Sequence, residues 1–258
     1  MYRPKIVVFT GAGLSADSGI ATYRSSAHVG GIPYEDIMNS KTLAERPELV
    51  HALCDERRSE LALAVPNAAH AMIADLAETY GDRVIHITQN IDDLVERAGY
   101  AGSIHVHGHL TIMRSIGNSK VEVDIGHRRY WSGPHDQAPD RGYRFRCPKS
   151  GSLFRPGVVL FNHLLYDEPA PHYPIMHRIM GGLRPDDLLI VIGTEGAVLP
   201  VSRWARNADC RKVLNNLHDA TDINTDYFDI YLKESAVTAA EKIRQIADDH
   251  MSAVRGGP

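Results

Sequence analysis

The first stretch that could do chemistry is 6-IVVFTGAGLSADSG-19, in which glycines directly follow an apolar run. Gly11 and Gly13 permit a tight turn with a close backbone approach, and a helix after them would direct free N–H groups at an anion. This arrangement suits a diphosphate. The third glycine falls at Gly19, where the helix would end early, so the spacing departs from GxGxxG. On these residues alone, an ordinary strand-to-helix turn explains the glycines equally well.

Two further polar stretches follow apolar runs. In 88-TQNIDDLVERAG-99, the side chains of Gln89, Asn90 and Asp92 come just after a buried strand, at the sheet edge where nucleotides bind. They can hydrogen-bond a ribose or a carboxamide, although Asn90 could instead cap the helix that follows. The stretch 104-IHVHGHL-110 supplies a His-Gly pair at the end of another short run.

The elements that must position these residues alternate along the chain. Continuous apolar and β-branched runs predict buried parallel strands, at residues 5–10, 84–88, 188–193 and 212–217. Between them, proline, asparagine and glycine at the expected ends predict helices, at residues 47–63, 67–81 and 235–251. This alternation is typical of a doubly wound, Rossmann-like α/β fold.

Two regions, 25–79 and 111–152, do not fit the alternation and look like insertions. We expect a Rossmann-like domain made of residues 1–30, 80–110 and 153–258. The insertions, 31–79 and 111–152, would form a smaller lobe. A ligand crevice would then lie between the lobes, at the carboxyl ends of the strands.

Composition bounds the class of protein. The chain has 258 residues, 43% of them hydrophobic, and a formal net charge of -4, so we expect a globular protein without nucleic-acid or membrane partners. It has no apolar run of about 20 residues and no signal-peptide pattern at its start, so we expect a cytoplasmic location. Cys54, Cys147 and Cys210 are far apart, which argues against disulfides and against a cysteine zinc cage.

The blocks GAGLSADSGIATYR, TQNID and HVHG, in this order and separation, resemble the signature blocks of the sirtuins, which are NAD-dependent protein lysine deacylases. Further matches are 155-RPGVVLF-161, 193-GTEGAVLP-200 and the pair Asn216-Leu217. The resemblance extends from about residue 5 to about residue 250. Within the family, the chain resembles the bacterial class that includes desuccinylases.

The resemblance implies cleavage of the nicotinamide–ribose bond of NAD, with the acyl-lysine oxygen attacking C1′ of the ribose. His107 would be the general base that activates a ribose hydroxyl, a role that suits an imidazole near neutral pH. Asn90 and Asp92 would receive the nicotinamide carboxamide and share the catalytic role. The residues that would contact NAD are Gly11, Ala12, Gly13, Tyr23, Arg24, Gln89, Asn90, Ile91, Asp92, Gly193, Thr194, Glu195, Asn216 and Leu217.

The resemblance also implies a substrate site. In sirtuins that remove acidic acyl groups, a tyrosine and an arginine three residues apart face the acyl pocket, and here Cys54 and Arg57 occupy those positions. The Arg57 guanidinium could pair with a succinyl or malonyl carboxylate. Alternatively, Arg57 and Arg58 form a solvated helix face with Asp55 and Glu56. The substrate peptide would lie along Val159, Phe161 and Asn162.

The chain departs from the family pattern at three places. Most sirtuins hold zinc with four cysteines in two CxxC pairs, but residues 111–120 and 147–150 contain only Cys147. We therefore predict no structural zinc and a lobe held by aromatic packing, which would involve Tyr130, Trp131, Tyr143 and Phe145. Glu195 replaces a serine and would place a carboxylate near the NAD phosphates. Phe161-Asn162-His163 replaces Phe-Gly-Glu in the segment that pairs with the peptide.

His105, His107 and His109 alternate, so on a strand they would share a face and imitate a metal cluster. Gly108 favours a bend in that strand, and no carboxylate or cysteine lies close to these histidines in the sequence. We therefore predict no metal site, with His105 and His109 in packing or supporting positions.

Three functions follow from these observations. The first is an NAD-dependent deacylase that acts on acylated lysine in a protein, or on a small acylated amine, and releases nicotinamide and O-acyl-ADP-ribose. The second is an NAD glycohydrolase or ADP-ribosyltransferase on the same scaffold, which the altered 161–163 segment motivates. The third is a non-catalytic NAD-binding module, against which intact Asn90, Asp92 and His107 argue.

Overall fold

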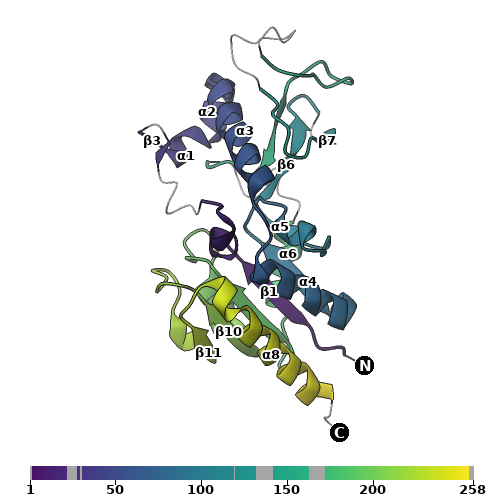
Figure 1. Cartoon of the computed structure of the whole chain (residues 1–258), viewed down its shortest axis with the longest axis vertical. Helices are drawn as coiled ribbons and strands as arrows, with labels where there is room; N and C mark the ends of the chain where they lie inside the picture. The colour runs from purple at the N-terminus through teal and green to yellow at the C-terminus, as the bar shows by residue number, and fades with distance from the viewer. Residues whose placement is uncertain are drawn as a thin grey trace.

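The computed structural model describes residues 2–21, 28–29, 31–118, 120–131, 142–162 and 172–255. Figure 1 shows two lobes along the long axis of the molecule, with both termini at the end of the larger lobe. Within the described ranges, no helix is both long enough and apolar enough to cross a membrane.

A six-stranded parallel sheet forms the larger lobe. Its order is β11 (Ile230–Leu232), β10 (Arg211–Asn215), β9 (Leu188–Ile192), β1 (Ile6–Thr10), β4 (Val84–Thr88) and β5 (Ile104–His105). The four longer strands confirm the predicted ones. In register, Thr10 lies between Thr88 and Ile192, so the polar stretches that follow these strands meet at one edge. The doubly wound α/β prediction is therefore confirmed.

Both faces of the sheet are covered by helices, because successive side chains of each buried strand point to opposite sides. Ile6 and Val8 pack against α4 (Ala68–Tyr80) and α8 (Ala236–Arg255). Val7 and Phe9 pack on the other face against α6 (Tyr173–Gly181) and α7 (Val201–Asn207). The edge of the Trp204 ring meets Phe9, with the ring centroids 5.5 Å apart.

The smaller lobe combines helices with a three-stranded antiparallel sheet. The sheet has the order β7 (Glu122–Asp124), β6 (Gly108–Ser115) and β8 (Phe154–Val158). The helices are α1 (Tyr34–Ile37), α2 (Ser40–Glu45) and α3 (Pro47–Leu63), which lie beside this sheet in Figure 1. The remaining elements are β2 (His28–Val29), β3 (Ile32–Pro33), α5 (Leu94–Arg97) and the 3-10 helices η1 (Ala12–Leu14), η2 (Ala16–Ser18), η3 (Gly81–Arg83) and η4 (Thr225–Tyr227).

The placement of α4 bears on the division into lobes. Its Ile73 and Leu76 are fully buried in the core of the large sheet, whereas the sequence division gave residues 31–79 to the small lobe. Strand β8, assigned by that division to the large domain, pairs with β6 of the small lobe. We therefore propose that, among the described residues, the small lobe comprises those within 31–64 and 108–161.

A buried ion pair and an aromatic cluster hold the small lobe. Arg58 and Asp55 of α3 pair at 2.6 Å, with the Arg58 side chain 0% exposed, so the alternative of a solvated helix face does not hold for these two residues. Asp55 also accepts hydrogen bonds from the amides of Tyr130 (2.9 Å) and Trp131 (2.7 Å). Tyr130 lies at the centre of the expected aromatic packing, which is confirmed and comprises Tyr130, Trp131, Tyr143, Phe145 and Phe154.

Serine hydroxyl groups lie beside Cys147, the cysteine in the segments that correspond to the zinc-binding pairs of other sirtuins. The hydroxyls of Ser115 and Ser152 are 3.0 Å apart, and those of Ser150 and Ser152 are 2.7 Å apart. Hydrogen bonds from Ser115 and Ser150 lower the pKa of the Cys147 thiol to about 7. Cys147 itself is buried.

Candidate functional site

The turn after β1 is locked to the turn after β9. The amide of Gly11 donates to the Ile192 carbonyl, and that of Gly13 to the Gly193 carbonyl, each at 2.9 Å. A Cβ on Gly13 would lie 2.6 Å from the Gly193 Cα, so the glycine is required by this approach of two backbones. Two short 3-10 helices follow, in place of the regular helix that we expected, and they end at Gly19 in a left-handed conformation (φ 84°).

Ser15 joins this turn to the stretch after β4. Its hydroxyl donates to Asp92 at 2.9 Å and accepts from the Asn90 side-chain amide at 3.1 Å. Burial raises the pKa of Asp92, although hydrogen bonds from the Leu94 amide and Ser15 oppose that shift. At the start of α5, the Leu94 amide donates a hydrogen bond to the side chain of Asp92 at 3.2 Å and not to that of Asn90, so Asn90 is not the helix cap. The Asn90 side chain instead bonds Ser15 within the site.

His70 supports the same cluster from α4. Its Nε2 lies 3.2 Å from the Ser15 hydroxyl, while its Nδ1 accepts the Asn67 amide at 3.0 Å. The Asn67 side chain in turn caps α4 and donates to the carbonyl of Leu14. Burial lowers the pKa of His70 to about 4, which keeps the imidazole neutral.

His107 lies at the junction of β5 and β6. Its Nδ1 is 3.0 Å from the Gln89 carbonyl oxygen, which fixes Nδ1 as the protonated nitrogen and leaves Nε2 as a base. The Tyr173 hydroxyl lies 3.4 Å from that Nε2. Burial lowers the pKa of His107, against the opposing effect of the Gln89 hydrogen bond. A neutral imidazole at neutral pH is the form that a general base requires.

A chain of hydrogen bonds connects the next two predicted blocks. The Gln89 side chain donates to the Thr194 hydroxyl at 2.8 Å, and Asn216 exchanges two bonds with the Thr194 backbone at 3.0 and 2.9 Å. Glu195 is half-buried beside them. The side chain of Leu217, which follows Asn216, is 56% exposed. Ile91 packs into the small-lobe core.

The predicted peptide segment follows β8. The Val159 amide donates to the His107 carbonyl at 2.8 Å, and Phe161 pairs its backbone with Met38 (2.8 Å) and Ser40 (3.2 Å). Asn162 adopts a positive φ of 59°. Tyr23, Arg24 and His163, which the sequence also singles out, lie outside the described residues.

The two acyl-pocket candidates on α3 differ in their surroundings. Cys54 is buried in the apolar core of the small lobe, 3.9 Å from the sulfur of Met38. The Arg57 side chain is 21% exposed and pairs with Glu60 at 2.7 Å. Arg57 is therefore the one of the two that faces solvent and could meet a charged group.

Three residues of the cluster were missed from sequence: Ser15, His70 and Tyr173. Ser15 lies inside the glycine-rich block, three positions after the Ala12 of the turn, and a hydroxyl there was a usable signal. His70 and Tyr173 come from α4 and α6, whose patterns indicate only packing.

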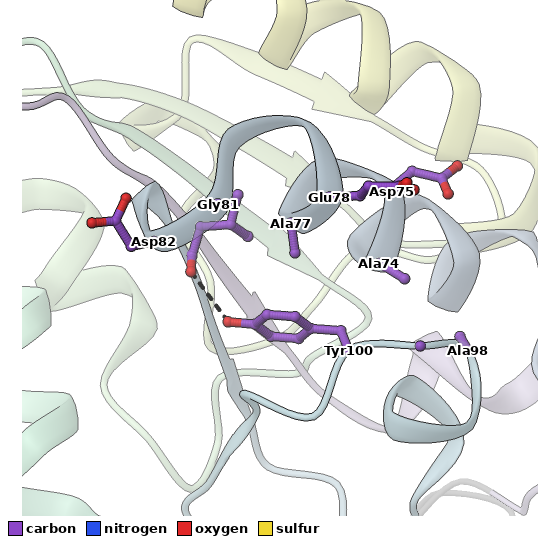
Figure 2. Close-up of a pocket in the computed structure, with 10 residues that line it drawn as sticks. Ala74, Asp75, Ala77, Glu78, Gly81, Asp82, Ala98 and Tyr100 are labelled. Carbon is purple, nitrogen blue, oxygen red and sulfur yellow. Dashed lines mark hydrogen bonds between the residues drawn. The ribbon is translucent and has the colours of Figure 1, made fainter.

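A surface hollow of about 530 Å³ lies away from these residues. Figure 2 shows Tyr100 beneath α4, with its hydroxyl bonded to a main-chain oxygen, that of Val84, at 3.1 Å. Asp75, Glu78 and Asp82 give the hollow an acidic rim. None of the predicted site residues lines it, so we do not assign it to the site.

Comparisons with known proteins agree with the geometry. An NAD-dependent protein deacylase of Helicobacter hepaticus is 36% identical over 92% of this chain and 95% of its own length. One from Campylobacter jejuni is 34% identical over 92% and 93%. The crystal structure of a Sir2 homologue–NAD complex has a TM-score of 0.79 at 29% identity, covering 96% of this chain and 90% of its own. A mutant Sir2 homologue bound to 2′-O-acetyl ADP ribose gives 0.77 at 28% identity, covering 96% and 93%. Since the Sir2 family model also matches residues 11–200, this chain belongs to the Sir2 family.

Proposed function

We propose that the protein is an NAD-dependent protein deacylase that transfers the acyl group of an acyl-lysine to ADP-ribose and releases nicotinamide. The observation that carries the proposal is the placement of His107. Its Nδ1 is held by the Gln89 carbonyl, directly before the Asn90 and Asp92 cluster in the chain. A base, an amide and a carboxylate thus lie at one edge of the sheet.

NAD fits the two linked turns at that edge. The amides of Gly11 and Gly13 already donate to the backbone at the end of β9, so the Ala12 amide between them is our candidate for direct contact with the diphosphate. Thr194 and Asn216 support the facing turn. Asn90 and Asp92 would bind the nicotinamide carboxamide, for which an amide and a carboxylate are complementary partners.

His107 performs the proton transfer in this proposal. When bound, NAD would supply an electrophilic C1′ carbon for the acyl oxygen, with nicotinamide as the leaving group, and water would finally release the free lysine. The Nε2 of His107 then takes a proton from a ribose hydroxyl, and the Gln89 carbonyl stabilises the resulting imidazolium through Nδ1–H. Tyr173 limits the motion of the ring on its other side.

We also propose that Arg57 selects the acyl group. A succinyl or malonyl carboxylate would compete with Glu60 for the guanidinium. Arg57→Met should then lower desuccinylation relative to deacetylation by about 10–150-fold, because a hydrogen bond to a charged group is worth about 1.5–3 kcal/mol. Glu60→Gln, which releases Arg57, should shift the ratio the other way. An unchanged ratio in both variants would remove Arg57 from the acyl pocket.

The small lobe needs no structural zinc in this proposal. Cys147 lies beside serine hydroxyls, and Asp55 with the aromatic cluster supplies the cross-links. A cytoplasmic location, a small acylated amine as a further substrate and the absence of nucleic-acid or membrane partners stay predictions from the sequence.

Nicotinamide release tests the function. Purified protein is incubated with NAD alone and then with acetyl-, succinyl- and longer acyl-lysine peptides, and products are separated by chromatography. We expect release that depends on one class of peptide, with O-acyl-ADP-ribose formed in equal amount. Release that ignores every peptide would support NAD hydrolysis or ADP-ribosylation, and no release would support a binding module.

A further inference from the structure

Glu96, His105 and His109 form a cluster behind the proposed catalytic residues. Each offers one ligand atom, and the three atoms lie within 4.8 Å of one another. The His105 and His109 rings are 4.5 Å apart between centroids. His107, which stands between them in sequence, is not part of the cluster, because it turns to Gln89 and Tyr173.

Hydrogen bonds orient both imidazoles of the cluster. The Nδ1 of His105 lies 2.9 Å from the Asn90 carbonyl oxygen, so its Nε2 points to Glu96 Oε1 at 3.0 Å. The Nδ1 of His109 lies 2.9 Å from the Thr111 hydroxyl. A histidine that ligates a metal through one nitrogen almost always bonds a protein oxygen through the other, and both histidines have this arrangement.

Glu96 completes the set from α5. Its Oε2 is buried without a well-formed hydrogen bond among the described residues, although the Ser103 hydroxyl is near enough to favour the charged carboxylate. A second carboxylate, Asp93, lies beside the cluster, where it pairs with His127 at 2.8 Å. The cluster therefore has a carboxylate on α5 and two imidazoles on the strands that face it.

We propose that Glu96, His105 and His109 bind one divalent transition-metal ion, with zinc the ion that this donor set suits best. Two histidines and a carboxylate form a known three-ligand zinc set. Bonds of ~2.0–2.1 Å to a tetrahedral ion place the ligand atoms about 3.3 Å apart. The observed 3.0 Å between His105 and Glu96 is close to that spacing, and water would occupy the fourth position because Glu96 and His109 are only partly buried.

This site replaces the prediction of no metal that the sequence supported. That prediction depended on the lack of a carboxylate close to the histidines in sequence, and Glu96 is nine positions before His105. The fold brings them together because α5 follows the carboxyl end of β4, and His105 ends the neighbouring parallel strand β5 at the same edge of the sheet. The ion would join α5 to the strands on either side of His107. The inference does not depend on the proposed deacylase function.

Metal titration tests the site. Protein stripped with a chelator is titrated with Co²⁺, followed by visible absorption, and with Zn²⁺, followed by calorimetry. We expect one tight site with the absorption bands of tetrahedral cobalt. Glu96→Gln and His109→Ala should lose that site. Thr111→Val, which removes the bond that orients His109, should weaken binding by about 10–100-fold. His218→Ala, at an exposed histidine, is the matched control and should bind as the wild type does.

Several outcomes would overturn the inference. Equal cobalt binding by the wild type and His109→Ala would do so, as would no stoichiometric binding by the wild type. A metal lost in Cys147→Ser but kept in His109→Ala would place the ion in the small lobe instead. If Glu96→Gln unfolds, judged by circular dichroism, the His109 variant still decides, since His109 is only partly buried, and Thr111→Val keeps the shape of a buried side chain.

Discussion

The main-chain oxygen of Gln89 lies 3.0 Å from His107 Nδ1, while the side chain of the same Gln89 donates to Thr194 at 2.8 Å. One residue therefore connects the proposed base to the turn proposed to hold NAD. A shift of that turn would move the base with it, and this coupling motivates the predictions on catalysis.

His107→Ala should lower formation of O-acyl-ADP-ribose by about 10²–10⁴-fold, the usual contribution of a general base. NAD affinity should be retained, because the ring contacts Gln89 and Tyr173 and not the glycine turns. Product chromatography and NAD calorimetry measure the two effects. Deacylation at the wild-type rate would refute the assignment, and His218→Ala serves as the control.

The pH profile should reflect the lowered pKa of His107. Burial disfavours the imidazolium, so the folded protein keeps a neutral base below 6.5, the ordinary pKa of histidine. The acid limb of kcat/KM should therefore lie below pH 6.5, with full activity above it. A measured acid limb centred above 6.5 would show that His107 is not the titrating base.

Neighbouring arginines on α3 should differ in stability. Arg58→Met leaves Asp55 buried without its cation and should cost about 3–5 kcal/mol of unfolding free energy. Arg57→Met removes a partly exposed ion pair and should cost no more than about 1 kcal/mol. Denaturant titration of both variants measures the difference. Equal losses would mean that the Asp55–Arg58 pair does not hold the lobe.

Gly13→Ala should destabilise the protein by about 1–3 kcal/mol and weaken NAD binding, because the added Cβ meets the Gly193 backbone. Gly181→Ala on α6 meets nothing within 4 Å and should be neutral or slightly stabilising. Thermal unfolding and NAD titration separate the two. Unchanged NAD affinity in Gly13→Ala would detach this turn from the cofactor site.

Acid should destabilise the fold through its buried histidines. Burial, with the charge of Arg58, lowers the pKa of His51 to about 3, and burial lowers that of His86 to about 3. The unfolded chain takes up these protons as pH falls through about 6.5, whereas the folded chain does not until about pH 3. Stability is thus present above pH 6.5 and lost as pH falls toward 3.

His51→Phe isolates one of these protons. His51 packs against Tyr130 and Tyr143, and neither ring nitrogen has a well-formed hydrogen bond among the described residues, the Phe154 backbone offering a weak one. The variant should reduce the slope of unfolding free energy between pH 6 and pH 4 by about 1.4 kcal/mol per unit. Denaturant titrations across this range test it. An unchanged slope would mean that His51 is protonated in the fold.

The sequence was sufficient for the four longer strands of the large sheet, because each is a short, continuous apolar run rich in β-branched residues. The short strands β5 and β11 were not predicted. The sequence also placed Gln89, Asn90 and His107 at one edge, since parallel strands end together. The same logic could not find His70 or Tyr173. Those side chains reach the site from helices on the faces of the sheet, and their sequence patterns report only burial.

Two contacts could not be predicted from sequence for a common physical reason. A solvated helix face was one alternative for Arg58 and Asp55 because charge predicts exposure, but a long-range contact with Tyr130 and Trp131 compensates their burial. Glu96 was not recognised as a partner of His105 because it lies nine positions earlier in the chain, and their contact depends on how α5 packs beside β5. Local patterns cannot reveal either contact.

The contacts of Asp55 with the amides of Tyr130 and Trp131 have a consequence for biosynthesis. Helix α3 leaves the ribosome about 70 residues before Tyr130 and Trp131, whose amides complete the hydrogen bonds to the Asp55 carboxylate. Until then the Asp55 carboxylate lacks the two amides that it binds in the fold and has Arg58, on the same helix, as its partner, so burial of the pair is unfavourable. We therefore expect the small lobe to assemble late and as one unit, after both insertions have been translated.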